Sequence, residues 1–196
     1  MNSDRAAYGV LKTTDAITQE IMRFGVEVVV TQAVSADDDL GRITGSTLEV
    51  VDDPKEATIA PFTLCHLFGH LVQFTTRDRY EHLIGPVSQH PPVILPESFW
   101  QEFYEYEREA FGYGATILES AVHPSNDLRV KYADFMETDF EHFQAFVSTG
   151  RRADRNTYRS NYQRRQLSHS DVRQICPLPI PRVNWAPLRG IDVAII

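Results

Sequence analysis

One apolar segment, Phe62–Val72, constrains the fold of this chain most, because it carries two histidines four residues apart. Pro61 precedes it, and proline suits the first turn of a helix, where its missing N–H has no partner to lose. Residues i and i+4 of a helix share one face, so His66 and His70 can direct their rings at a single ion. Gly69 has no side chain and would let another element approach this helix closely.

The segments around this helix predict an α+β fold. The first helix ends at Gly25, the three short β-rich runs after it suit a small sheet, and Gly85–Pro92 contains the breakers that make residues 75–96 irregular. Prolines keep the tail from Pro177 extended, and its apolar residues predict that it packs across the domain. We expect helices over residues 3–23, 61–74, 97–120 and 128–148, and strands over residues 26–32, 40–43 and 47–51.

The 196 residues, 42% of them hydrophobic, suit one folded unit with a substantial core. We divide it into a metal-binding domain over residues 1–120 and, over residues 121–196, a C-terminal helical extension with a proline-rich tail packed on the same domain. The sequence contains no run of eighteen apolar residues and no apolar N-terminal leader, so the predicted location is the cytoplasm. In that reducing compartment a disulfide between Cys65 and Cys176 is not expected.

The net charge of -8 argues against broad nucleic-acid binding. The exception is a basic patch between Arg151 and Arg165, where Asp154 is the only acid. Such a patch suits nucleic acid or an acidic partner, but the interpretation we favour is that its arginines pair with the acidic surface of this protein. The patch consists of Arg151, Arg152, Arg155, Arg159, Arg164 and Arg165.

A third metal ligand has to come from outside the histidine helix, because zinc takes about four ligands. The acidic helix over residues 97–120 is the natural source. We select Glu109, since the small residue Ala110 follows it and permits close packing beside the ion. Glu105 and Glu107 are the alternatives if the helix is rotated, and the acidic stripe of this helix can also be read as a solvated face.

Two segments together carry a family resemblance. The chain reads Phe-Thr-Leu-Cys-His-Leu-Phe-Gly-His over residues 62–70 and Glu-Arg-Glu-Ala-Phe-Gly-Tyr-Gly over residues 107–114. They resemble the ImmA/IrrE family of zincin-like metallopeptidases, in which Phe-Thr-x-x-His-Glu-x-Gly-His supplies two zinc histidines and the catalytic glutamate, and Glu-x-Glu-Ala-x-x-Phe-Ala supplies the carboxylate ligand. The resemblance covers about residues 1–120. It implies a zincin-like fold with zinc on His66, His70 and Glu109.

Leu67 stands where this family has its catalytic glutamate. A leucine cannot accept a proton, and loss of a positioned base costs about 10²–10⁴ in rate. The resemblance therefore implies a zinc-binding protein that is hydrolytically inactive or atypical and that binds a protein or peptide partner in the former substrate groove. The alternative is an active zinc peptidase with a substitute base, and its candidate catalytic residues are Glu105, Tyr106 and His82.

Two further interpretations use the same histidines. Two histidines and one carboxylate also form the facial triad of non-haem Fe(II) enzymes, for which a leucine at position 67 is harmless. Alternatively, His66 and His70 are hydrogen-bonded core residues without a metal. Burying two imidazoles on an apolar helix without partners costs free energy, which favours the metal interpretation.

Overall fold

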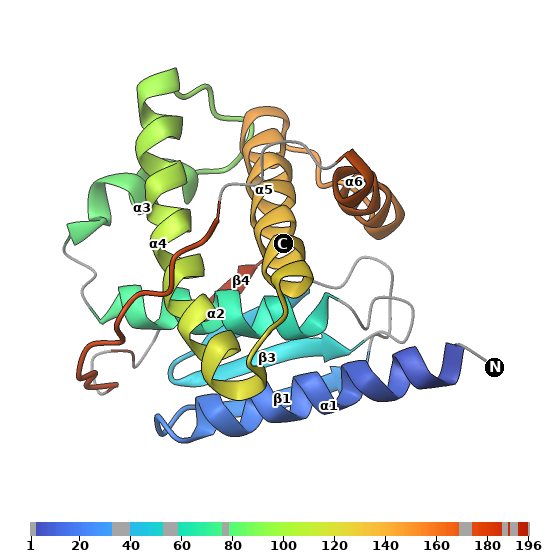
Figure 1. The fold of residues 1–196 in the computed structure, drawn as a ribbon. Helices are drawn as coiled ribbons and strands as arrows, with labels where there is room; N and C mark the ends of the chain where they lie inside the picture. Colours follow the sequence, from blue (N-terminus) through green and yellow to red (C-terminus); the bar gives the residue numbers. More distant parts are fainter. Residues whose placement is uncertain are drawn as a thin grey trace.

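The computed structural model describes residues 3–32, 40–52, 59–75, 79–168, 174–185, 188 and 192–195. These residues form an α+β fold (Figure 1). The helices are α1 (Ser3–Met22), α2 (Ala60–Phe74), α3 (Glu81–Val87), α4 (Glu97–Val122), α5 (Asn126–Thr149) and α6 (Arg155–Ser168). The strands are β1 (Glu27–Gln32), β2 (Gly41–Thr44), β3 (Thr47–Asp52) and β4 (Asp192–Ile195).

The sheet has four strands in the order β1-β3-β2-β4. β1 runs parallel to β3, and β2 is antiparallel to both β3 and β4. Gly45, at a φ of 60°, makes the turn between β2 and β3, as glycine does at little steric cost. The three predicted strands are confirmed to within a residue or two, but β4 comes from the end of the tail and was not predicted.

One face of the sheet is buried against helices. On this face lie Ile43, Leu48 and Val50, all without solvent exposure, whereas Arg42 and Thr44 alternate with them on the exposed side. This alternation is typical of an antiparallel hairpin with one covered face. The covering element is α2, which packs against both β2 and β3.

Helix α2 is the centre of the molecule. All of its residues from Ala60 to Gln73 are buried, so it has no solvated stripe. A helix that is apolar on every side belongs in the core. It packs on α1, α4, β2 and β3, so every polar side chain that it carries has to find its partner inside the protein.

The backbones of α2 and α4 touch where the two helices cross. A Cβ atom on Gly69 would lie 1.9 Å from the carbonyl oxygen of Ala110, and one on Gly114 would lie 2.5 Å from that of Cys65. The predicted role of Gly69 as a point of close approach is therefore confirmed. The contact brings the α4 residues next to Ala110 directly beside the two histidines.

Helices α3, α5 and α6 complete the helical part. Residues 75–96 were predicted to be irregular, and α3 shows that this was wrong for Glu81–Val87. Leu83 of α3 is buried in a second apolar cluster with Trp100 and Phe103 of α4, and this burial outweighs the helix-breaking tendency of Pro86. In Figure 1, α5 rises beside α4, with α6 on the outer side of α5.

The tail crosses the domain, as predicted (Figure 1). The Leu178 N–H donates to the carbonyl of Gly112 at 3.0 Å, and the Thr116 hydroxyl donates to the carbonyl of Leu178 at 2.6 Å. The Trp185 indole N–H donates to the carbonyl of Phe24 at 2.7 Å. The described part of the tail is thus hydrogen-bonded to residues of the predicted metal-binding domain.

Cys65 is a buried free cysteine and Cys176 an exposed one. No helix in the described ranges is both long enough and apolar enough to cross a bilayer.

Candidate metal centre

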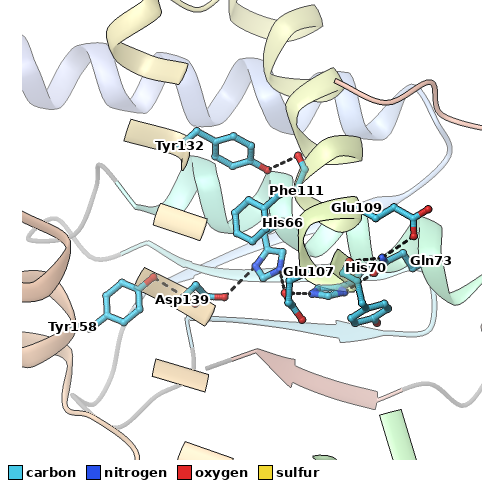
Figure 2. Close-up of polar contacts among 10 residues, drawn as sticks. His66, His70, Gln73, Glu107, Glu109, Phe111, Tyr132, Asp139 and Tyr158 are labelled. Carbon is cyan, nitrogen blue, oxygen red and sulfur yellow. Dashed lines mark hydrogen bonds and ion pairs between the residues drawn. The ribbon is translucent and has the colours of Figure 1, made fainter. Parts of the chain in front are cut away.

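Three buried side chains meet where α2 and α4 cross. His66 and His70 come from α2 and Glu107 from α4, and their candidate ligand atoms all lie within 4.8 Å of one another (Figure 2). The predicted pairing of the two histidines on one face is confirmed, with ring centroids 4.4 Å apart. The structure therefore contains a buried His-His-Glu group with the composition of a metal site.

The spacing of the ligand atoms suits a small tetrahedral cation. One carboxylate oxygen of Glu107 lies 2.9 Å from Nε2 of His66 and 3.3 Å from Nε2 of His70. Bonds of about 2.0–2.1 Å in a tetrahedron put neighbouring ligand atoms roughly 3.3 Å apart. Both distances from the Glu107 oxygen lie within a few tenths of an ångström of that spacing.

The second nitrogen of His70 is held by Gln73. The Gln73 amide nitrogen donates to the carbonyl of Tyr106 at 2.7 Å, so the amide oxygen is the atom that faces Nδ1 of His70 at 2.9 Å. An amide oxygen only accepts, so Nδ1 must carry the proton of the neutral ring. Nε2 of His70 is then an unprotonated nitrogen directed at Glu107.

A positive charge is needed between His70 and Glu107. The unprotonated Nε2 of His70 and the carboxylate oxygen of Glu107 are both acceptors, and two acceptors 3.3 Å apart inside a protein repel each other. Either an additional proton on His70 or a metal cation removes this repulsion. The donor set of two imidazole nitrogens and one carboxylate oxygen matches what zinc binds, so the residues fit a bound cation.

His66 lies between an aromatic ring and the carboxyl groups of two acidic residues. Its ring stacks on Phe111 of α4 with centroids 4.0 Å apart. Its Nε2 faces Glu107, and its Nδ1 lies 3.4 Å from a carboxylate oxygen of Asp139 on α5 (Figure 2). Asp139 was not a predicted site residue, although it is buried beside a predicted ligand.

Burial and neighbouring charges set the ionisation of this group. When His70 carries the additional proton in place of a metal, burial and then the charge of His70 lower the pKa of His66 to about 4. Burial raises the pKa of Glu107, but interactions with both histidines outweigh that effect and lower it to about 2. Burial and the charge of Glu107 raise the pKa of Asp139 well above its usual value. At neutral pH His66 is therefore neutral and Glu107 ionised, which are the forms that bind metals.

Glu109, the predicted third ligand, lies away from the histidines. Its carboxylate accepts hydrogen bonds from Gln73 at 3.1 Å, from Arg79 at 3.0 Å and from the Tyr80 hydroxyl. Two residues turn a helix by about 200°, so Glu107 and Glu109 cannot face the same ion. The structure corrects the selection to Glu107, one of the alternatives kept open.

The sequence does contain a signal for Glu107. It lies on the helical stripe of Phe103, Ala110, Phe111 and Gly114, all of which are buried. A carboxylate on an apolar stripe is more informative than one on an acidic stripe, because Glu is almost never fully buried unless it is paired. The same pattern marks Asp139 in α5, seven residues after the buried Tyr132.

The three candidate catalytic residues have other surroundings. Glu105 is exposed and pairs with Arg108, and His82 is exposed and pairs with Glu102. Tyr106 is buried with its ring beside His70, at a centroid distance of 5.4 Å, and burial raises the pKa of its hydroxyl. Of the three, Tyr106 contacts the His-His-Glu group. Its hydroxyl stays protonated at neutral pH because its pKa is raised, so it cannot accept a proton as a base.

Leu67 fills the space between α2 and the sheet. It has no solvent exposure, and one of its methyl carbons lies 2.6 Å from the point where a Cβ on Gly41 of β2 would stand. Gly41 therefore makes room for Leu67, and the position next to His66 is part of the apolar core.

The basic patch lies mostly on α6, which packs against α5. Arg165 forms an ion pair with Glu141 of α5, and the guanidinium of Arg152 lies over the ring of Phe146, 5.2 Å from its centroid. The Arg165 pair agrees with the favoured interpretation, in which the arginines pair with the acidic surface of this protein, whereas Arg152 contacts an aromatic ring. Buried Tyr158 and Tyr162 attach α6 to the core.

Comparison of the chain with models of protein families, with curated proteins and with solved structures found no match.

Proposed function

We propose that this chain is a zinc-binding protein of the ImmA/IrrE metallopeptidase type, with the ion on His66, His70 and Glu107. It acts as a binding or regulatory module for a protein or peptide partner rather than as a peptidase. The observation that carries the proposal is the buried His-His-Glu group, in which one Glu107 oxygen lies 2.9 Å and 3.3 Å from the facing nitrogens of the two histidines.

The proposal that this protein does not cleave peptides rests on Leu67. A metallopeptidase needs a base beside the metal-bound water, and here that position is occupied by a fully buried leucine packed on Gly41. Asp139 is the nearest other carboxylate that contacts a ligand, but it faces Nδ1 of His66, the ring nitrogen on the side away from Glu107. When bound, zinc would supply a Lewis acid at this site; the chain's own residues supply the ligands and a dry surrounding.

Metal analysis of protein purified without a histidine tag tests the site. We expect about one zinc per chain in the wild type and in His82→Ala, which removes an exposed histidine. His70→Ala should lose the metal, because only two ligands remain. A wild type without metal would contradict the proposal, and iron in place of zinc would favour the Fe(II) facial triad.

Proteolysis assays with the zinc-loaded protein test the missing base. The wild type should not cleave a general protein substrate, because nothing at position 67 accepts a proton. Leu67→Glu should gain zinc-dependent cleavage over Leu67→Gln, which places an uncharged group of similar size there. Chelator-sensitive cleavage by the wild type would overturn the pseudoenzyme part, and a folded, zinc-loaded Leu67→Glu without activity would contradict the metallopeptidase relationship.

A further inference from the structure

Asp139 is the least expected residue beside the metal centre. It belongs to α5, outside the two segments that carry the family resemblance, and it is only 8% exposed. One of its carboxylate oxygens lies 3.4 Å from Nδ1 of His66. That nitrogen is fully buried and makes no hydrogen bond in the structure, so this carboxylate is the polar group within reach of it.

We propose that Asp139 is a positioning residue that holds His66 through Nδ1 and so directs Nε2 at the ion. The inference rests on the proposed metal site. A metal on one imidazole nitrogen makes the N–H on the other a better donor, and a carboxylate that accepts from it fixes both the tautomer and the ring orientation. The bound state would shorten the 3.4 Å contact to a hydrogen bond.

The other neighbours of the His66 ring cannot take this role. Phe111 stacks on the ring and Phe135 meets it edge-on, with centroids 4.0 and 6.5 Å away. Two aromatic neighbours restrict the plane of the imidazole, but neither accepts an N–H hydrogen bond of useful strength. The polar contact at Nδ1 comes from Asp139, whereas Glu107 meets the opposite nitrogen, Nε2.

The two histidines thus have different partners on their outer nitrogens. His70 has the amide oxygen of Gln73 at 2.9 Å, whereas His66 has a carboxyl oxygen of Asp139 at 3.4 Å. Both partners come from outside the ligand set and face the nitrogen that would not bind the ion. Asp139 should therefore contribute to metal affinity although it does not touch the ion.

Tyr158 connects this arrangement to α6. Its hydroxyl donates to the second oxygen of Asp139 at 3.4 Å, and its ring is buried against α5 (Figure 2). The carboxyl group therefore lies between a ligand histidine and a tyrosine from the following helix. Tyr158→Phe removes only the hydroxyl and provides a milder variant for the same test.

The test measures zinc affinity of the full chain by chelator competition, and the visible spectrum of the cobalt(II) form. Asp139→Asn keeps the shape of the side chain and should weaken zinc binding roughly 10–100-fold and shift the cobalt bands. Tyr158→Phe should weaken zinc binding roughly two- to tenfold, which corresponds to the loss of one hydrogen bond. Glu141→Gln removes an exposed charge from the same helix and should leave affinity and spectrum unchanged.

The metal affinities of these variants distinguish failure of the Asp139 role from failure of the metal site. The role of Asp139 is overturned if both variants, Asp139→Asn and Tyr158→Phe, bind zinc and cobalt as the wild type does. Both must also melt as cooperatively as the wild type in the absence of metal. This outcome would leave the proposed metal site intact. If Asp139→Asn does not fold, the Tyr158→Phe affinity decides in its place. A wild type that binds neither metal would instead overturn the proposed function, and this assignment with it.

Discussion

At the residue scale, the ligand set depends on which of two glutamates faces α2. Glu107 and Glu109 are two positions apart on α4, and the first is 9% exposed, in contact with both histidines. Glu109 instead accepts from Gln73, whose amide oxygen faces His70, so it lies one step further from the ion. Both carboxylates thus belong to the same network, but only Glu107 reaches the ligand nitrogens.

Exchanging each glutamate for glutamine separates these roles. Glu107→Gln should lose zinc, because it removes an anionic ligand and weakens binding by more than the 10–100-fold that is typical of an outer partner. Glu109→Gln should retain about one zinc per chain, since its amide oxygen can still accept from Gln73. Metal content after dialysis, together with competition against a chelator, measures both. Loss of zinc in the second variant alone would restore Glu109 as the ligand.

The residue-scale predictions from the sequence succeeded where local spacing decides. Positions four apart on a helix share a face wherever the helix lies, so His66 and His70 were paired correctly. The apolar stripe of α4 favours Glu107 over Glu109, but only the packing of α4 on α2 turns that stripe toward the histidines. Asp139 was missed for the same reason, because it comes from a third helix whose packing was unknown.

At the element scale, the crossing of α2 and α4 holds the site together. It depends on Gly69, above which the carbonyl of Ala110 occupies the space of a side chain. The two helices supply all three proposed ligands, so any change in their separation moves Glu107 relative to the histidines. The glycine is therefore as important for the geometry of the site as the ligands themselves.

Gly69→Ala should both destabilise the protein and weaken its zinc binding. The new methyl group would stand 1.9 Å from a backbone oxygen, and overpacking of this kind costs roughly 1–3 kcal/mol or more. Gly85→Ala in α3 is the control, because nothing lies within 4 Å of its Cβ position and alanine favours a helix by about 1 kcal/mol. Urea unfolding and zinc content measure the two effects. Equal stability of the two variants would argue against the close crossing.

Helices and strands were predicted well where hydrophobic periodicity and stop signals mark them. They were predicted poorly where a contact with a distant part of the chain determines whether the element forms. Helices α1, α2, α4 and α5 agree with their predicted ranges to within about two residues. Helix α3 contains Pro86, yet it forms because Leu83 is buried against α4. Strand β4 lies in the β-branched run at the end of the tail, but its place in the sheet comes from pairing with β2, a contact with a distant part of the chain.

At the scale of the whole molecule, the candidate metal site joins parts of the chain that are far apart in sequence. His66 and Glu107 are 41 positions apart and make a buried contact, and Asp139 adds a third helix. The tail then runs over α4, and β4 closes one edge of the sheet. A group assembled from α2, α4 and α5 exists only in the folded protein.

Zinc should therefore raise the melting temperature of this protein. Free zinc at 100 times its dissociation constant adds about 2.7 kcal/mol to folding if the unfolded chain does not bind it. For a chain of this size, each kcal/mol corresponds to roughly 2–4 °C, so the expected rise is about 5–11 °C. Thermal melts with zinc and with a chelator measure it, and His70→Ala should show no difference. An unchanged wild-type melting temperature would contradict a folded-state metal site.

The sequence by itself determined the local part of this protein: an apolar helix with paired histidines, and most of the helices and strands. These follow from the fixed periods of helix and strand, which neighbouring residues already specify. Only the tertiary structure decided that Glu107 faces the histidines, that Asp139 lies beside His66 and that the tail supplies a fourth strand. Those contacts depend on the rotation and separation of elements, which the packing of Gly69 on Ala110 and of α5 on α4 sets.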